Sequence, residues 1–164
     1  MKVSQQEALE RLEYNPETGV LRWRKPRSNR LKIGDIAGYR DERGYQRVQF
    51  GPNRHYAHQI IWLMMTGEWP FEIDHRNMDR SDNSWTNLRK CERSENRGNQ
   101  RVTRSNKLGI KGVSFIDDHY RAKPYVMQIT RGGKRIRKWF ATVEEAQASY
   151  AEHAPKVFGE FARY

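Results

Sequence analysis

Two neighbouring residues near the middle of the chain, Asp74 and His75, have side chains suited to phosphodiester hydrolysis. Cutting a phosphodiester requires a base that activates water and a cation that stabilises negative charge on the phosphate and the leaving oxygen. An imidazole with an unperturbed pKa of about 6.5 takes a proton from water near neutral pH. A carboxylate is a hard oxygen ligand for a divalent cation. His75 is therefore a candidate general base and Asp74 a candidate metal ligand.

Both residues lie in a segment, residues 72–100, whose composition is too polar to be kept compact by burial alone. Neighbours in an extended strand point to opposite sides, so the two side chains could face metal and water separately. The same segment holds Asn87 and Asn96, spaced for a returning strand and a short helix that turn both amides toward Asp74. Any one of these residues alone is more simply a surface histidine or a turn asparagine, whereas the four together favour a site.

The chain is strongly basic, which favours nucleic acid as its partner. Its 31 Lys and Arg against 20 Asp and Glu leave a net charge of +11, enough to neutralise phosphates and release their counterions. A ribosome-associated protein or a merely very soluble one would also be basic. Cys91 is the single cysteine, which excludes an internal disulfide and a four-thiolate zinc site.

Most of this charge lies between residues 101 and 140, which hold eleven basic and two acidic side chains and so nine of the eleven excess charges. The closing segment from residue 143 is more acidic. Because residues 101–140 also carry the candidate strands of the C-terminal half, the basic face should belong to a sheet and the linker before it. We expect that sheet to approach DNA first.

Hydrophobic periodicity divides the chain into a β-rich start, a buried helix, the polar segment and a second module. The elements expected before the polar segment are a helix at 4–14, strands at 20–24, 35–39 and 45–50, and a buried helix from 56 to Gly67. The elements expected after it are strands at 113–115, 125–129 and 135–140 and an amphipathic helix from 143.

No stretch approaches the roughly eighteen consecutive apolar residues of a membrane span. The first residues are polar and lack the apolar region of a secretory signal. We therefore expect a cytoplasmic protein with no membrane partner.

Short motifs in and before the polar segment resemble those of the HNH endonucleases that bacteriophages and mobile introns encode. They are Ile73-Asp74-His75, Asp82-Asn83, Asn87-Leu88-Arg89 and Glu95-Asn96, preceded by Tyr56-Ala57-His58 and Thr66-Gly67-Glu68-Trp69-Pro70. The resemblance covers residues 14–99. It implies a ββα-metal core, in which two short strands and a helix hold one divalent cation, and the host cell cytoplasm as location if a phage encodes the chain.

The resemblance also implies a role for each residue. His75 becomes the general base, Asp74 and Asn96 become metal ligands, and Asn87 holds the first strand and the imidazole in register. Many HNH enzymes have a histidine at the position of Asn96, and the neutral amide oxygen favours Mg²⁺ or Mn²⁺ over a softer ion. His58 is expected to be structural.

The C-terminal module resembles the DNA-binding domain of plant ethylene-response factors. The motifs that carry this resemblance are Gly109-Ile110-Lys111-Gly112-Val113-Ser114-Phe115, the strand at 125–129, and Thr142-Val143-Glu144-Glu145-Ala146 with Tyr150-Ala151. It implies a three-stranded sheet laid in the major groove and backed by one helix. Lys138 stands where a glycine is usual, and Pro155 falls inside the expected helix, where it should remove a hydrogen bond and kink or end it.

These observations predict an α+β protein with a ββα-metal (HNH) core, a β-rich N-terminal lead-in, and a C-terminal three-stranded antiparallel sheet packed on one helix. The predicted domains are an HNH endonuclease domain at 1–100, a basic linker at 101–108 and an ethylene-response-factor-like DNA-binding domain at 109–164. The residues expected to contact DNA are Arg89, Arg101, Arg104, Lys107, Lys111, Arg121, Arg131, Arg135 and Arg137.

The predicted function is a metal-dependent, homing-type endonuclease that acts as a monomer on double-stranded DNA and nicks one strand per active site. A non-catalytic, sequence-specific DNA-binding regulator is the alternative. An RNA-binding or ribosome-associated protein would explain the charge and leave the four polar residues as a coincidence.

Overall fold

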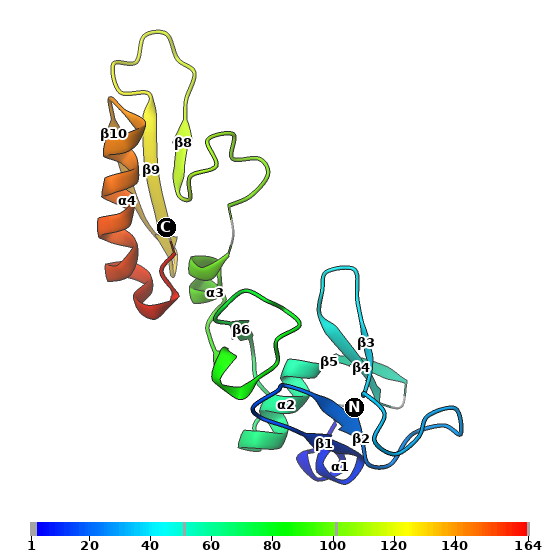
Figure 1. Cartoon of the computed structure of the whole chain (residues 1–164). Helices are drawn as coiled ribbons and strands as arrows, with labels where there is room; N and C mark the ends of the chain where they lie inside the picture. The colour runs from blue at the N-terminus through cyan, green and yellow to red at the C-terminus, as the bar shows by residue number, and fades with distance from the viewer. Residues whose placement is uncertain (1–2, 51, 101, 164) are drawn as a thin grey trace. The chain divides into compact units, whose positions relative to one another are not determined.

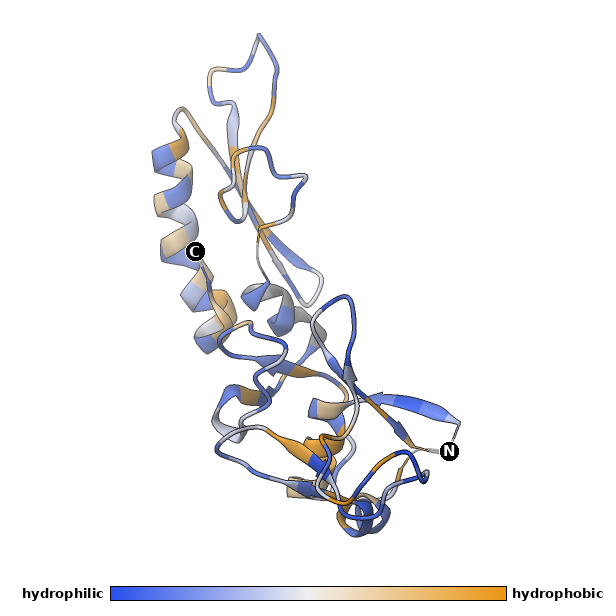
Figure 2. Ribbon diagram, turned by 45° about the vertical axis from the view of Figure 1, so that its right-hand side comes forward, coloured by the Kyte–Doolittle hydropathy of each residue, from blue (hydrophilic) through white to orange (hydrophobic). Residues whose placement is uncertain are grey.

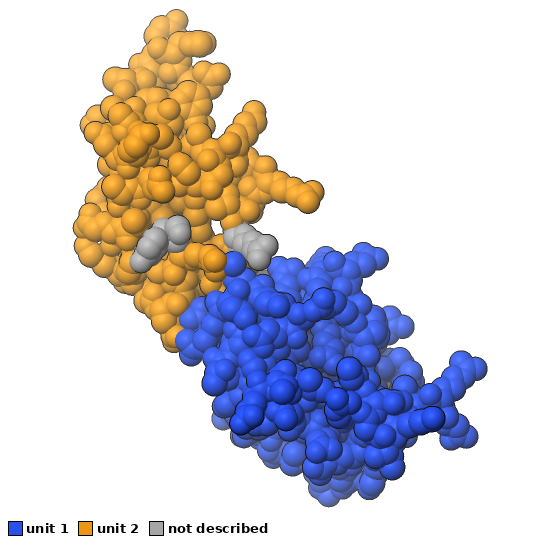
Figure 3. Space-filling view, in the orientation of Figure 1, with its two compact units in different colours: residues 1–91 blue, residues 92–164 orange. Residues whose placement is uncertain are grey.

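The computed structural model describes residues 3–50, 52–100 and 102–163, without the side chains of Arg93, Ser94 and Arg97. The chain forms two compact units, Met1–Cys91 and Glu92–Tyr164, which Figure 3 colours separately. Each unit combines helices with small antiparallel sheets, so the expectation of mixed α and β structure is confirmed. None of the helices in the described ranges is both long and apolar enough to span a membrane.

The elements of the first unit can be followed along the chain in Figure 1: α1 (Gln5–Arg11), β1 (Leu12–Tyr14), β2 (Leu21–Trp23), β3 (Tyr39–Arg40), β4 (Gln46–Phe50), β5 (Asn53–Tyr56), α2 (Ala57–Thr66), β6 (Ile73–His75), η1 (Trp85–Asn87) and β7 (Leu88–Lys90). β1 pairs with β2, β3 to β5 form a three-stranded sheet in chain order, and β6 pairs with β7. All of these pairings are antiparallel.

Two expectations for the β-rich start are wrong. The helix predicted over 4–14 stops short, because Leu12 leaves it to pair with Trp23. Of the strand predicted over 35–39, only Tyr39 belongs to a strand. In addition, the sequence does not predict β5, because its polar side chains show no hydrophobic alternation. This strand forms through its pairing with β4.

α2 lies at the centre of the hydrophobic core of the first unit. Its buried residues are Ala57, His58, Ile60, Ile61, Leu63 and Met64. They pack with buried side chains of the neighbouring strands, among them Leu12, Leu21, Trp23, Val48 and Phe50. Gly67 ends the helix in the left-handed region (φ 77°), and its N–H donates to the Leu63 carbonyl. The predicted buried helix and its end at Gly67 are confirmed.

The second unit contains α3 (Arg93–Asn99), β8 (Val113–Phe115), β9 (Tyr125–Arg131), β10 (Lys134–Phe140), α4 (Val143–Phe158) and η2 (Gly159–Phe161). Its antiparallel sheet has the order β10-β9-β8, and α4 packs against it. The buried residues of α4 are Ala146, Tyr150, Ala154 and Phe158, which recur every four residues on one face. Figure 2 shows the matching alternation of hydrophobic and hydrophilic residues along this helix. The three predicted strands and the helix are present.

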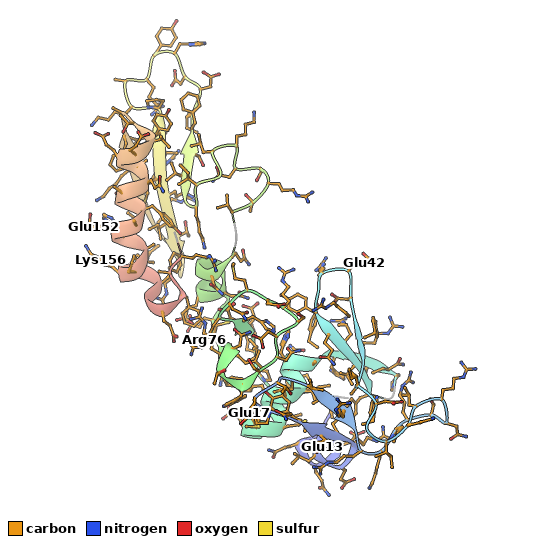
Figure 4. All side chains as sticks on the ribbon, viewed as in Figure 1. Glu13, Glu17, Glu42, Arg76, Glu152 and Lys156 are labelled. Carbon is orange, nitrogen blue, oxygen red and sulfur yellow. The ribbon has the colours of Figure 1, made fainter. Side chains whose placement is uncertain are left out.

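Pro155 does not end α4, contrary to one of the two outcomes expected for it. The helix continues to Phe158, and the N–H of Gly159 donates to the carbonyl of Pro155. Glu152 and Lys156, one turn apart on the exposed side of this helix, form an ion pair at 2.7 Å (Figure 4).

Candidate active site

The hairpin of β6 and β7 carries Asp74 and His75. In its register Asp74 lies opposite Arg89, and His75 lies opposite Leu88. All three residues of β6 are buried, so both faces of the strand are covered. Asp74 is 6% exposed and His75 is 3% exposed, and as strand neighbours they point to opposite faces. The fold therefore holds both side chains in place, because they lie on a buried strand and not in a solvent-exposed loop.

Asp74 forms a buried ion pair with Arg89. Nε and Nη2 of Arg89 both donate to Oδ2 of Asp74, at 2.9 and 2.7 Å. Each side chain is only 7% exposed. Because a buried charge is costly without a partner, each of the two side chains holds the other in place. The phosphate contact predicted for Arg89 stays a prediction, and the contact that the structure describes is with Asp74.

His75 lies among polar and aromatic side chains in the interior of the first unit. Its Nε2 is 3.2 Å from Oδ1 of Asn83, and its ring centroid is 6.0 Å from that of Tyr45. Burial lowers the pKa of His75, while the hydrogen bond to Asn83 and the charge of Asp74 act in the opposite direction. The imidazole is therefore neutral at neutral pH, the form that accepts a proton.

His58 lies beside His75, and its ring packs against the His75 ring. The two ring centroids are 5.1 Å apart with the planes at 85°, and His58 also stacks on Tyr56 with the planes 9° apart. Burial, followed by the charge of His75, lowers the pKa of His58 to about 3. A histidine that stays neutral between rings fits the structural role expected for it.

Asn87 ties the loop between β6 and β7 to the hairpin. Its Oδ1 accepts from the Asn77 N–H at 2.9 Å, and its Nδ2 donates to the Asp82 carbonyl at 2.7 Å. The hydroxyl and the backbone N–H of Ser84 donate to the Asp82 carboxylate, and the hydroxyl bond is the main cause that lowers its pKa. Hydrogen bonds of its own polar side chains hold this loop in place. They explain how a segment that is too polar to be kept compact by burial is ordered.

Asn96 lies on α3, which belongs to the second unit. Within that unit Arg131 donates to the Glu95 carboxylate at 2.7 Å, and Lys111 donates to the carbonyl of Gly98. The structure thus brings the other three predicted site residues together in the first unit and describes Asn96 in the second.

The predicted DNA-binding residues of the C-terminal half have different surroundings. Arg104 and Lys107 are exposed, and Arg101 lies outside the described residues. Lys111 and Arg131 make the internal contacts with α3 described above, and Arg131 also donates to the carbonyl of Val157. Their predicted contacts with DNA would compete with these internal bonds.

Arg135 and Arg137 lie on the sheet face that is turned away from α4. They alternate along β10 with Lys138, whose ammonium is hydrogen-bonded to His153 on α4. Trp139 shares the face of the two arginines, and the guanidinium of Arg137 lies 4.7 Å from its ring centroid. Arg121 lies 4.2 Å from the same ring. We call these four residues the basic sheet face: Arg121, Arg135, Arg137 and Trp139.

Among the residues that the structure describes, no group of three or more His, Cys, Asp or Glu side chains is placed to hold a metal ion. The donors predicted from the sequence are the Asp74 carboxylate and the Asn96 amide, both of them oxygen ligands. Mg²⁺ is commonly bound by one or two carboxylates with the remaining positions taken by water and substrate phosphate. By its chemistry this donor set fits a hard divalent cation.

Two residues that the sequence did not predict contact the candidate base, one directly and one through an intermediate residue. Asn83 is 1% exposed and bonded to His75, and Gln46 on β4 is bonded in turn to Asn83. Asn83 stands in the Asp82-Asn83 motif, so a signal was present. Gln46 lies far away along the chain, and its sequence context does not distinguish it from any other strand glutamine.

Residues 55–97 match a family model described as HNH endonuclease. The matched stretch runs from β5 into α3 and includes all four predicted catalytic and metal-binding residues. No match is found among curated proteins or among solved structures. The match supports an HNH-type nuclease acting on DNA, a class that generally depends on a divalent metal. The resemblance of the C-terminal module to ethylene-response factors and a phage origin stay predictions.

Proposed function

We propose that this protein is a metal-dependent DNA endonuclease that hydrolyses phosphodiesters with His75 as its general base. The observation that carries the proposal is the buried pair of strand neighbours Asp74 and His75, inside the residues that match HNH endonucleases. An exposed pair would be held in place far less firmly.

In the proposed reaction, His75 takes a proton from water as the water oxygen forms a bond to phosphorus. The bond between phosphorus and the leaving oxygen of the sugar breaks, and that oxygen keeps the bonding electron pair and takes a proton from solvent. Burial supports this role because it keeps the imidazole unprotonated at neutral pH. Asn87 supports it indirectly by holding the loop that follows His75.

The cation, which we expect to be Mg²⁺ or Mn²⁺, would be held by Asp74 and Asn96. When bound, it would supply positive charge that stabilises the phosphate and the leaving oxygen. The assignment of Asn96 rests on the sequence resemblance and on the family match, which ends one residue beyond it. Arg89 is assigned to hold Asp74, since its described hydrogen bonds go to that carboxylate. We further propose that β6, β7 and α3 form a ββα-metal core.

DNA affinity is assigned to the C-terminal module, proposed at residues 109–164 after a linker at 101–108 and an endonuclease domain at 1–100. The basic sheet face is the surface proposed to contact DNA, because exposed arginines beside an aromatic ring suit phosphate and base contacts. The enzyme is proposed to be a homing-type monomer that nicks one strand. Concerted double-strand cleavage at monomeric concentrations would contradict nicking.

The proposal is tested by incubating the protein with duplex DNA from the genome that encodes it. Denaturing gels resolve the two strands after incubation with Mg²⁺ or with EDTA. We expect cuts with Mg²⁺ and none with EDTA. His75→Ala should still bind DNA but cut it about a hundredfold or more slowly. His119→Ala is the matched control, since it removes an exposed histidine of the second unit and should leave cleavage intact.

The alternative, a DNA-binding regulator without catalysis, is motivated by the charge of the second unit. Tight, salt-sensitive binding by the wild-type protein with no cuts in Mg²⁺ would favour it. Displacement of duplex DNA by RNA in a competition experiment would favour the RNA-binding hypothesis instead.

A further inference from the structure

A continuous hydrogen-bonded network connects the β-rich start of the chain to the candidate base. Nε2 of Gln46 donates to the carbonyl of Ala37 at 2.7 Å. Nδ2 of Asn83 donates to Oε1 of Gln46 at 3.2 Å, and Oδ1 of Asn83 lies 3.2 Å from Nε2 of His75. We call this the Gln46–Asn83–His75 network.

The direction of every bond in this network follows from its first member. A backbone carbonyl only accepts, so the Gln46 amide must turn its NH₂ group to Ala37 and its oxygen to Asn83. The Asn83 amide must then donate to Gln46 and turn its own oxygen to His75. An amide oxygen only accepts, so Nε2 of the neutral imidazole must carry the hydrogen.

Asn83 is held so that it does not readily turn to another partner. It is 1% exposed, and the Tyr14 hydroxyl donates to its backbone carbonyl at 2.9 Å. The chain at Gly19 (φ 72°) approaches it so closely that a Cβ there would lie 2.5 Å from the Asn83 carbonyl carbon. Next to this, the Trp85 N–H donates to the Pro16 carbonyl at 2.8 Å. The turn before β2 therefore packs on the backbone that presents the Asn83 amide.

The other end of the network is equally restrained. Ala37 is fully buried, and its N–H donates to the carbonyl of Leu21 at 2.8 Å. At the next residue, Gly38 (φ 99°), a Cβ would lie 2.1 Å from the carbonyl oxygen of Arg47. The acceptor that orients Gln46 is thus fixed by a close approach of two backbone segments.

We propose that Gln46 and Asn83 are positioning residues for His75, which hold its ring in one orientation and in the tautomer with hydrogen on Nε2. This rests on the proposed function, since it deepens the role of His75 as base. In this tautomer Nδ1 carries the lone pair, so it is the ring nitrogen that can accept a proton. The other tautomer would carry a hydrogen at that nitrogen and would be unable to act as base there.

The tautomer is measured directly by long-range ¹H–¹⁵N correlation spectra of the full-length wild-type protein near neutral pH, without DNA. The His75 signals are assigned by their loss in His75→Asn. We expect the ¹⁵N shifts of a protonated Nε2 and an unprotonated Nδ1. A protonated Nδ1, or an averaged mixture of tautomers, would overturn the proposal. This measurement does not depend on cleavage, so it separates the network from the nuclease hypothesis.

A matched pair of variants tests the role of Gln46. Gln46→Met keeps the length of the side chain and removes both hydrogen bonds, while Gln49→Met makes the same change on the opposite face of β4. With saturating DNA, we expect Gln46→Met to lower the single-turnover cleavage rate about tenfold or more and to show mixed His75 tautomers. Its affinity for DNA should stay that of the wild type.

Gln49→Met should match the wild type in rate and spectrum. If Gln46→Met does not fold, Asn83→Ser, which shortens the amide to a hydroxyl, replaces it with the same two readouts. An unchanged tautomer and an unchanged rate in a folded Gln46→Met or Asn83→Ser protein would overturn the proposal. If the wild-type protein fails to cleave while its spectrum shows the expected tautomer, the nuclease hypothesis falls and the network remains as a structural feature.

Discussion

Arg89 and Asp74 lie directly opposite each other on β7 and β6, and the guanidinium donates two hydrogen bonds to a single carboxylate oxygen, at 2.9 and 2.7 Å. The pair connects the two strands at the position where the metal ligand is proposed. The sequence predicts that Arg89 contacts DNA, whereas the contact described in the structure is with Asp74, its neighbour across the hairpin.

Removing the guanidinium should destabilise the first unit. Arg89→Ala leaves the buried Asp74 charge without this partner, a change that costs about 3–5 kcal/mol. The neighbouring Lys90→Ala removes an exposed ion pair with Glu68 and should cost less than about 1 kcal/mol. Urea unfolding followed by tryptophan fluorescence compares the two variants. Equal small decreases in stability would show that the Asp74–Arg89 pair does not hold the hairpin.

The loop after β6 should depend on the Asn87 amide. Asn87→Ala leaves the Asn77 N–H and the Asp82 carbonyl without this partner, which should cost about 1–3 kcal/mol and speed hydrogen exchange at Asn77. Thr86→Ala changes the exposed residue beside it and serves as the control. If the Asn77 amide hydrogen exchanges as slowly in Asn87→Ala as in Thr86→Ala, other contacts order the loop.

Acid should destabilise the first unit through His58. Its pKa is about 3 in the folded protein and about 6.5 when unfolded, so between these values the unfolded chain binds a proton that the folded one excludes. The free energy of unfolding should therefore fall as pH decreases through this window, by up to about 1.4 kcal/mol per pH unit from this one group.

His58→Phe keeps a ring beside Tyr56 and removes the titration. Urea midpoints measured from pH 7.5 down to 4.5 should fall less steeply for this variant than for the wild type. Parallel curves for the two proteins would contradict the assignment of this proton uptake to His58.

The salt dependence of DNA binding should report the basic sheet face. If Arg135 and Arg137 neutralise phosphates, replacing both with glutamine weakens binding and reduces the slope of log K against log salt by about 0.9 for each phosphate that is no longer neutralised. Lys138→Gln removes a charge on the same strand that points toward α4. Because Lys138→Gln removes one charge and the double replacement removes two, a slope reduced half as much by Lys138→Gln would show that net charge, and not this face, sets the affinity.

The parts of the fold that the sequence predicted are those whose hydrophobic pattern is strong and local. The buried helix ending at Gly67 and the three strands and amphipathic helix of the second unit belong to this group. The sequence pattern predicts a helix at Leu12, because helical spacing and a three-residue strand alternation are indistinguishable over so short a stretch. β5 has no pattern of its own and exists through its pairing with β4.

The candidate site shows the same division. Asp74, His75 and Asn87 were predicted from residue types and motifs, and the structure places them on one hairpin and its loop. The pairing of Arg89 with Asp74 follows from strand register, which the sequence does not specify. Gln46 reaches His75 through Asn83, and a contact between residues so far apart along the chain exists only after folding.

The most direct test of the central claim is the single-turnover rate at which His75→Ala cleaves its DNA site in Mg²⁺, with protein saturating. Removing a general base should slow cleavage by about a hundredfold or more and leave the dissociation constant for DNA unchanged. A variant that folds, binds and cleaves at the wild-type rate would show that His75 is not the base and that the chemistry lies elsewhere in the protein.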